Sequence, residues 1–445
     1  MIPPATQKVR SVKGSIRNVL RQLPDGPVTR FAGTLKFISW SSFPFLYRCP
    51  NKQHCCRKGL TRTSYHNPID QRVMRASRLE MSDLMNRTRR LMILVWLVSA
   101  SSVLGQRQDV GVADKQKVEP RIRKSLQLLS SSARVYTEEQ ECFSCHHQAL
   151  PVMTLQLAQQ QGIQAATDTI GKQAQFTREY YQQRQEKIGK GGGIPGGSYS
   201  AGYALLTLAA ANSPADSLRD AMVQYLRKKQ KSQGHWSIGT HRPPLEDSDF
   251  TATAVSLAGI HWADRKSSSE ERQQLLTRAR GWLRATRPKT TEDRVFQLFG
   301  LAWAQVGPSE RLATPLARRP YQDWLAAEDR SVAKDQSSAL LKLQREDGGW
   351  AQLPTLSSDA YATGEALCSL YVVGALSDRD EVFRRGIQYL LKSQREDGSW
   401  QVSTRSKPIQ TYFESGFPHG KSQFISIAGT SWATMALLLS LTGDR

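Results

Sequence analysis

The sequence is poor in cysteine, and half of its cysteines fall near the N-terminus. The chain has 445 residues and 6 cysteines, of which Cys49, Cys55 and Cys56 lie ahead of residue 81. The others, Cys142, Cys145 and Cys368, are too few for a disulfide scaffold. A chain of this length buries enough apolar surface to fold without such cross-links, which excludes a small disulfide-stapled domain.

The N-terminal region also lacks an apolar run long enough to span a bilayer, for which about 18 residues are needed. The run Leu91–Leu104 is shorter, follows the basic segment Arg87–Arg90 and ends beside Gly105. This arrangement is typical of a secretory signal peptide, here residues 81–105, with cleavage near Gly105. A transmembrane anchor is the alternative. We therefore expect an exported protein, periplasmic or secreted, whose mature chain has no transmembrane span.

A signal peptide should start a protein, yet 80 residues precede this one. Met81 and Met85 lie just upstream of the apolar run, so we expect residues 1–80 to be a non-native or disordered extension. A basic arm that binds nucleic acid is the alternative. Residues 1–106 carry 18 Lys and Arg against 4 Asp and Glu, whereas the remainder carries 43 against 35. The remainder is only mildly basic, and no nucleic-acid partner is expected.

One short sequence returns three times along the chain. Gln394–Trp400 reads QREDGSW, Gln344–Trp350 reads QREDGGW, and Gln230–Trp236 reads QKSQGHW. The shared pattern is Gln-x-x-x-Gly-x-Trp, and each copy follows a run with helical periodicity. A unit that returns in this way indicates a repeat architecture.

Each copy lies between two helices of different character. Ahead of Gln394, an amphipathic outer helix is predicted because Phe383, Ile387 and Leu390 share one face. The segments after the copies are apolar nearly all round, which predicts buried inner helices. These segments begin at Thr251, Tyr361 and Thr430.

The residue types of the repeat have separate physical roles. Gly398 stands where a helix C-terminus needs a residue that tolerates positive φ. Trp400 is expected to plug the turn, and Gln394 to tie one helix end to free backbone groups of its neighbour. The corresponding residues of the other copies are expected to act in the same way.

Counted from residue 118, the chain holds six outer–inner pairs, which predicts an all-α fold with a single (α/α)6 toroid over residues 118–445. Outer helices are expected at 120–135, at 167–188, from Ser213, after the capping box Ser267–Glu270, up to Gln344, and after Ser377. Inner helices are expected at 144–161 and from about Ser198, Asp249, Glu292, Asp359 and Thr430.

The repeat and its alternating helices resemble the squalene/oxidosqualene cyclases and the β subunits of protein prenyltransferases, over residues 118–445. The resemblance implies closed α/α toroids and an isoprenoid or other apolar small molecule as partner. Those cyclases hold their substrate between two toroids, whereas this chain has one. Every inner helix of such a toroid runs the same way, so their N-termini share one mouth where function is expected.

The sharpest chemical motif is Cys142-Phe-Ser-Cys145-His146 at the start of the first inner helix. Cys-x-x-Cys-His is the attachment pattern of haem c, in which the thiols form thioethers and His146 ligates the iron. The alternatives are a Cys142–Cys145 disulfide, a zinc site with a fourth ligand from elsewhere, or chance. Haem would imply a redox protein with an electron-transfer partner.

The loop before the last inner helix, 408–426, is long and aromatic, and ring closure should bring it beside His146. His419 in this loop is the candidate for the second iron ligand, with His147 and Met153 behind it. The alternative is a lid in which aromatic side chains cap the barrel. The candidate pocket residues of this loop are Tyr412, Phe413 and Phe417.

The start of the third inner helix, from Glu246 to Ala252, resembles the Asp-x-Asp-Asp-Thr-Ala motif of squalene-hopene-type cyclases. Asp247 matches the first Asp and Asp249 the middle one, while Phe250 replaces the last. The resemblance implies that Asp249 is the acid that protonates an alkene, aided by Asp247. Ordinary helix capping is the alternative, since Asp293 and Asp359 repeat the placement.

Glu365 lies on a buried inner helix, one turn from Asp359 and Tyr361, and a carboxyl group there must be paired or face a cavity. We therefore take Glu365, Tyr361 and Asp359 as pocket residues. Three hypotheses follow for the whole chain: a haem redox protein, an isoprenoid cyclase that uses Asp249, or a non-catalytic interaction toroid.

Overall fold

In the computed structural model, the two kinds of helix alternate along the chain as the sequence predicts. The structure describes residues 115–164, 167–263, 268–304, 316, 325–408 and 411–441, all of which belong to the compact unit Val95–Arg445. The predicted extension 1–80 and signal peptide 81–105 lie outside the described residues, so both stay predictions.

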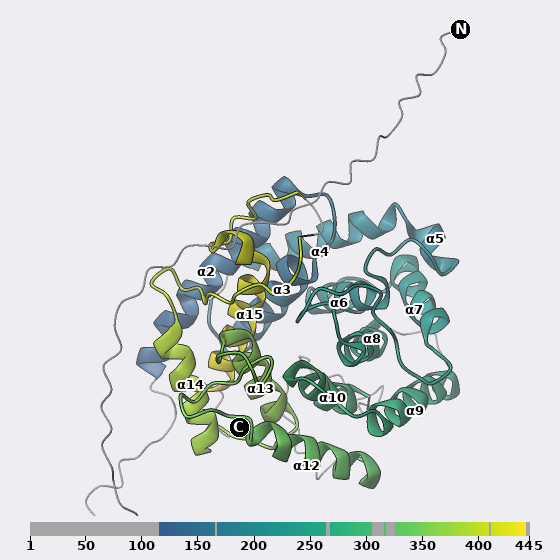
Figure 1. The fold of residues 1–445 in the computed structure, drawn as a ribbon. Helices are drawn as coiled ribbons and strands as arrows, with labels where there is room; N and C mark the ends of the chain where they lie inside the picture. The colour runs from purple at the N-terminus through teal and green to yellow at the C-terminus, as the bar shows by residue number, and fades with distance from the viewer. Residues whose placement is uncertain are drawn as a thin grey trace, which may run out of the picture. The chain divides into compact units, whose positions relative to one another are not determined.

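Within the described residues, the inner helices form a closed ring (Figure 1). Each inner helix contacts the next in chain order, and the last returns to the first. The inner helices are α3 (Leu150–Gln160), α6 (Gly197–Ala210), α8 (Asp249–Ala263), α10 (Thr291–Trp303), α13 (Ala360–Val372) and α15 (Gln423–Leu439). The predicted all-α toroid is therefore confirmed.

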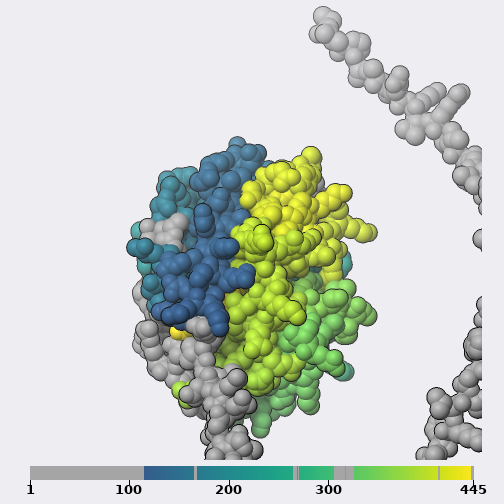
Figure 2. Space-filling model, turned by 90° about the vertical axis from the view of Figure 1, so that its left-hand side faces the viewer, coloured from purple at the N-terminus to yellow at the C-terminus, as the bar shows by residue number. Residues whose placement is uncertain are grey.

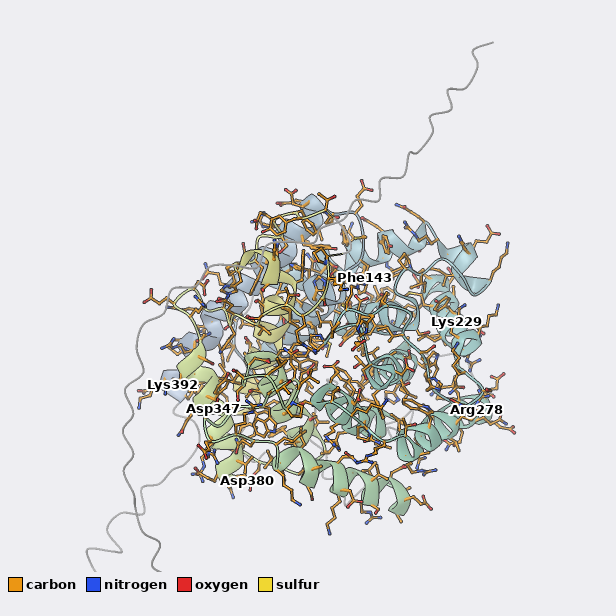
Figure 3. The ribbon with its side chains drawn as sticks, viewed as in Figure 1. Phe143, Lys229, Arg278, Asp347, Asp380 and Lys392 are labelled. Carbon is orange, nitrogen blue, oxygen red and sulfur yellow. The ribbon has the colours of Figure 1, made fainter. Side chains whose placement is uncertain are left out.

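The outer helices surround this ring, and the first of them closes the circle beside the last, as the blue and yellow-green surfaces in Figure 2 show. Charged side chains such as Lys229, Arg278 and Lys392 lie on these outer helices (Figure 3). The outer helices are α2 (Lys115–Glu139), α4 (Thr167–Gln182), α7 (Ser217–Lys229), α9 (Ser269–Ala285), α12 (Ala327–Leu341) and α14 (Glu381–Ser393).

The repeated glutamine joins neighbouring outer helices. Gln394 Nε2 donates to Arg121 O of α2 at 3.0 Å, and Gln344 Nε2 donates to Val382 O of α14 at 2.8 Å. Gln230 bonds α9 in the same way, at 3.0 Å. The predicted tie is confirmed, although Arg121 and Leu275 accept from within the neighbouring helix and only Val382 lies at a helix end.

The other gaps between outer helices are joined by different side chains. Gln173 Nε2 of α4 donates to Ala133 O of α2 at 3.0 Å. Arg178 of α4 pairs with Asp216, the N-cap of α7. Asp329 of α12 pairs with two arginines of α9, whose sequence has no Gly-x-Trp turn after it. Each pair of adjacent outer helices therefore has a polar connection.

The Gly-Trp turn works as predicted except in its position. Trp350 is fully buried, its Nε1 donates to Leu340 O at 2.8 Å, and its backbone N–H donates to Thr363 Oγ1 at 2.9 Å. Gly348 has φ +87°, and a Cβ there would lie 2.4 Å from Arg385 O. The glycine lies in a turn beyond α12 rather than at its C-terminus, because the helix ends at Leu341.

Several predicted boundaries are wrong by a few residues. The sixth inner helix begins at Gln423 rather than near Thr430, because the 3-10 turn Gly420–Ser422 leads directly into it. The capping box of α9 is Ser268 with Glu271, one residue later than predicted. The second outer helix stops at Gln182 and is followed by the short helix α5 (Gln185–Gly189).

Inner helices approach each other closely where a glycine faces the next helix. A Cβ on Gly364 of α13 would lie 2.5 Å from the backbone of Trp432 in α15, and one on Gly202 of α6 would lie 2.5 Å from Val255 O in α8. Among the described residues, the segment Gly420–Leu439 is long and apolar enough to cross a membrane, but 89% of it is buried in the toroid. It serves here as a core helix.

Candidate functional site

The loops that precede the inner helices are bonded to one another. Ser406 Oγ, ahead of α15, donates to Pro243 O ahead of α8 at 2.9 Å. Arg405 Nε donates to Gln352 Oε1, ahead of α13, at 2.8 Å. Residues separated by about half of the toroid therefore meet at one mouth.

A cavity of about 510 Å³ opens at this mouth, within the size range of small-molecule sites. Its walls come from the first turns of α8, α10 and α13 and from the loops before them, and they combine aromatic, acidic and basic side chains. The lining includes Asp247, Asp249, Phe250, Trp282, Arg287, Lys289, Glu292, Asp293, Gln352, Tyr361, Glu365 and Arg405.

Two buried carboxyl groups from neighbouring inner helices lie together in the cavity wall. Glu292 of α10 and Glu365 of α13 are 6% and 1% exposed and are joined by a side-chain hydrogen bond. Tyr361 Oη donates to Glu292 Oε2 at 3.0 Å, and Thr251 Oγ1 donates to Glu292 Oε1 at 2.7 Å. Glu365 Oε1 is buried and has no hydrogen-bond partner among the described residues.

Burial controls the protonation of this pair. It raises the pKa of Glu292 to about 7, with a further contribution from the Asp293 charge. Burial, followed by the like charge of Glu292, raises the pKa of Glu365 well above its ordinary value. One hydrogen bond between two carboxyl groups needs one proton, so the pair holds a proton where isolated surface carboxylates are ionised.

Asp249 and Asp247 line the same cavity but lie nearer to solvent. The Asp249 side chain is 40% exposed, and its Oδ1 accepts a hydrogen bond from the Ile238 N–H at 2.8 Å. Its Oδ2 lies 3.7 Å from His235 Nε2. Asp247 pairs with His241 at the surface. Asp249 thus holds the preceding loop against α8 and presents its carboxylate at the rim.

The alternative role, capping of a helix N-terminus, is found for some of these aspartates and not for others. Asp359 is the N-cap of α13 and accepts from Ala362 N–H at 2.9 Å, and burial raises its pKa to about 6. Asp293 forms a capping box with Thr290. Asp249 bonds to the preceding loop instead. Glu365 and Tyr361 line the cavity as predicted pocket residues, while Asp359 supports the helix that carries them.

The Cys142–His146 motif lies in a packed cluster at the start of a π-helical turn, Cys145–Ala149, which leads into α3. Cys145 is 5% exposed, and its Sγ lies 3.3 Å from Tyr199 Oη of α6. Cys142 Sγ lies 3.3 Å from Tyr136 Oη of α2. Both thiols are free, so the disulfide considered as an alternative to haem attachment is not formed in this structure.

The histidines of the motif are bonded to each other. His146 Nδ1 lies 2.6 Å from His147 Nδ1 and 2.9 Å from Ser144 Oγ. Burial lowers the pKa of His146 to about 3. His147 is fully buried, and its Nε2 has no hydrogen-bond partner among the described residues. Burial also lowers the pKa of His147 well below its ordinary value, so both rings are neutral near pH 7.

This arrangement fits a haem poorly. The two thiols contact tyrosines of different helices, and the His146 ring packs 5.4 Å from the ring of Phe424. Within the described part of the chain, no three His, Cys, Asp or Glu side chains are grouped so as to hold a metal ion. Haem attachment therefore stays a prediction from the motif.

The aromatic loop reaches the motif as predicted, but not through His419. Phe413 lies 5.9 Å from the ring of Tyr136 and 5.4 Å from that of Phe424. His419 Nε2 instead lies 2.8 Å from Ser399 Oγ. Phe417 is buried against Leu129 and Ile427, and Tyr412 is 47% exposed. None of the three predicted aromatic pocket residues, Tyr412, Phe413 and Phe417, is among the residues that line the described cavity.

Comparison with known families agrees with this geometry. Residues 70–283 and 322–413 match the prenyltransferase alpha-alpha toroid domain, which is more than half of the chain. The chain belongs to the prenyltransferase alpha-alpha toroid family. The matched range begins ahead of residues 81–105, the segment predicted as a signal peptide.

Sequence relatives of this toroid include two fungal enzymes. The chain is 34% identical over 142 residues to lanosterol synthase erg7A of Aspergillus fumigatus, covering 32% of this chain and 18% of that protein. It is 29% identical over 120 residues to lanosterol synthase ERG7 of Saccharomyces cerevisiae, covering 27% and 15%. The matches span less than a fifth of the relatives' length.

Solved structures also match the chain at low identity. A type II terpene cyclase from Scytonema in complex with geranylgeranyl dihydroxybenzoate is 14% identical, with a TM-score of 0.44, covering 72% of this chain and 98% of that one. A possible GH105 family member from Klebsiella pneumoniae is 14% identical, with a TM-score of 0.46, covering 75% and 95%. The function has to be argued from the site, because one fold carries many functions.

Glu292 is a site residue that was not predicted from the sequence. Its position at the start of an inner helix was expected, but its contact with Glu365 was not. The available signal was that two carboxyl groups occur near the starts of consecutive inner helices that are otherwise buried. Trp282, which belongs to the outer helix α9, was missed because nothing local indicates that its ring reaches the mouth.

Proposed function

We propose that this toroid is an enzyme that converts an isoprenoid-type or other apolar small molecule by acid–base chemistry in the cavity at the inner-helix mouth. The observation that carries the proposal is the convergence of Asp249, Glu292 and Glu365 on one cavity that Phe250 and Trp282 also line. Aromatic faces stabilise positive charge in a bound molecule, and carboxyl groups move protons.

The resemblance to squalene-hopene-type cyclases assigns the starting proton to Asp249. If Asp249 donates that proton, Asp249→Asn should lower product formation from squalene-like substrates by about 10²–10⁴-fold, the range typical of a lost general acid. Chromatography of the products measures the effect. Asp335→Asn, on the exposed face of α12, is the matched control and should leave turnover unchanged. Unchanged turnover in Asp249→Asn would remove the acid role.

Haem attachment, with export through residues 81–105, is the second proposal from the sequence. It predicts that the chain, expressed from Met81 in a host that matures c-type cytochromes, carries haem that survives denaturation. Staining of the denatured protein and its Soret absorption measure this, with Cys142→Ser as the control that breaks the motif. A denatured wild-type chain without haem would end this proposal. An interaction toroid gains if neither haem nor turnover is found.

A further inference from the structure

The buried carboxyl pair has no role in the acid step assigned to Asp249. Glu292 and Glu365 come from two different inner helices, yet both side chains line the cavity and bond to each other. Buried carboxyl groups are normally paired with cations or avoided, because two like charges this close cost free energy. A site that places them together in a cavity wall is built to bind a proton or a cation.

The surroundings of the pair favour one negative charge. The donors from Tyr361 and Thr251 both bond to Glu292, so they stabilise its carboxylate form. Tyr361 also contributes a hydrogen bond to Glu365, but Glu365 has no counterpart of the Thr251 donor, and among the described residues its Oε1 has no hydrogen-bond partner. The proton is therefore held by Glu365 and shared with a Glu292 carboxylate.

The helices packed against the pair carry further charged and titratable side chains that face it. Asp293 of α10 and Asp359, ahead of α13, add negative charge, and Tyr203 of α6 and Cys368 of α13 face the pair as neutral groups. The cations that line the same cavity are Arg287, Lys289 and Arg405. Arg405 bonds to Gln352 rather than to either glutamate, and within the described part of the chain neither glutamate forms a salt bridge.

We propose that the Glu292–Glu365 pair is the catalytic base of the cavity, which stabilises a cationic intermediate and accepts the proton that ends the reaction. This proposal rests on the proposed function. The O–H bond of Asp249 breaks as a C–H bond forms on the substrate alkene, which leaves a carbocation. A C–H bond beside the cation then breaks, its electrons form a new alkene, and the proton moves to the Glu292 carboxylate. The product is an isomer of the substrate. Asp249 then regains a proton from water, and the Glu292–Glu365 pair releases one to water.

The first test needs no substrate. Infrared titration should show two steps for the wild-type protein, one carboxyl group losing its proton near pH 7 and a second persisting to higher pH. Glu365→Gln should remove the signal that persists, while keeping the size of the side chain. Tyr361→Phe should move the first step to higher pH, because the carboxylate of Glu292 loses a donor. An unchanged titration in Glu365→Gln would overturn the proposal.

The pair should also change stability with pH. Both folded-state pKa values lie above the ordinary 4.5 of a glutamate, so the stabilising contribution is full below that pH and is lost as pH rises through about 7 and beyond. Glu365→Gln should flatten this decline in the free energy of unfolding. Glu381→Gln, on an exposed side chain of α14, is the control and should retain it.

The second test uses a cation in place of the intermediate. N,N-dimethyldodecylamine, charged at neutral pH, should bind the wild-type protein at least tenfold more tightly than dodecanol does. Glu292→Gln should lose most of this preference, whereas Glu381→Gln should keep it. Equal affinity of the wild-type protein for the amine and the alcohol would contradict a cation-stabilising cavity.

Product analysis separates this proposal from the proposed function. Glu292→Gln and Glu365→Gln should still consume substrate, because Asp249 is intact, but should shift products from alkenes to alcohols formed by water addition. A merely structural role would lower all products in proportion, and that result would overturn the base role. A wild-type protein that converts no isoprenoid-type substrate would reject the proposed function, and with it the catalytic step. The titration and the amine binding would still decide whether the pair binds a proton and a cation.

Discussion

Trp350→Ala should lower the free energy of unfolding of the toroid by about 3–5 kcal/mol, as expected for removing a fully buried tryptophan. The indole has no exposed surface, and its loss leaves Leu340 O without the 2.8 Å bond from Nε1. The surrounding helices are tied to other neighbours and have little freedom to close the cavity. Urea unfolding followed by circular dichroism and fluorescence measures the change.

The control for this substitution is Leu343→Ala, close in sequence but 40% exposed. It should change the free energy of unfolding by less than about 0.5 kcal/mol. Trp350→Phe should fall between the two, since it fills most of the space but removes the indole N–H. If both alanine variants had the same effect, the Gly-Trp turn would not be the plug between outer and inner layers.

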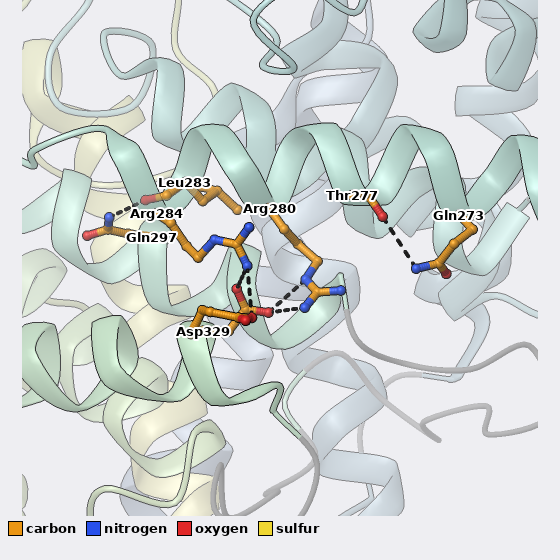
Figure 4. Close-up of polar contacts among 8 residues, drawn as sticks. Gln273, Thr277, Arg280, Leu283, Arg284, Gln297 and Asp329 are labelled. Carbon is orange, nitrogen blue, oxygen red and sulfur yellow. Dashed lines mark hydrogen bonds and ion pairs between the residues drawn. The ribbon is translucent and has the colours of Figure 1, made fainter.

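Asp329→Asn should destabilise the protein by about 3 kcal/mol, the lower end of the cost of breaking a buried ion pair. Asp329 is fully buried in α12, and its two oxygens accept from Arg280 and Arg284 of α9 (Figure 4). The amide keeps the shape of the side chain but removes the negative charge that both guanidinium groups face, although Arg284 still lies 3.6 Å from Glu328. The expected loss of stability lies at the lower end because Arg284 is 30% exposed, so water compensates part of the lost interaction.

A matched surface pair provides the control for Asp329. Asp168 pairs with Lys172 on α4, where both side chains are more than 60% exposed. Asp168→Asn should lower the free energy of unfolding far less than Asp329→Asn, because exposed ion pairs contribute little. High salt should reduce the effect of Asp168→Asn more than that of Asp329→Asn, because buried pairs are screened less. A small effect at Asp329 would mean that α9 and α12 are held together by apolar packing alone.

The fold could be predicted from the sequence almost completely, whereas only some residues of the site could. Tyr361 and Glu365 were placed in the pocket because the apolar periodicity of their helix leaves a carboxyl group with few other environments. Their partner Glu292 was missed, since its approach to Glu365 depends on the rotation of α10 about its own axis. That rotation is set by packing against α8 and α13, so it cannot be predicted from the sequence of α10 alone.

The same limit explains the aromatic loop. Ring closure correctly placed residues before α15 beside the Cys142–His146 motif. Which side chain makes the contact was decided by the early start of α15, which puts Phe424 on the helix against His146 and leaves His419 to bond Ser399. Because α15 begins seven residues earlier than predicted, the residue that lies against His146 is Phe424 and not the predicted iron ligand His419.

The sequence by itself determined the repeated unit, the alternation of amphipathic and wholly apolar helices, and hence the toroid, because helical periodicity and the Gln-x-x-x-Gly-x-Trp turn are local properties. Only the tertiary structure decided that Glu292 and Glu365 lie together in the wall of the cavity. Such a pairing depends on distances between helices that are remote in the chain, and burial, rather than sequence, sets its charge.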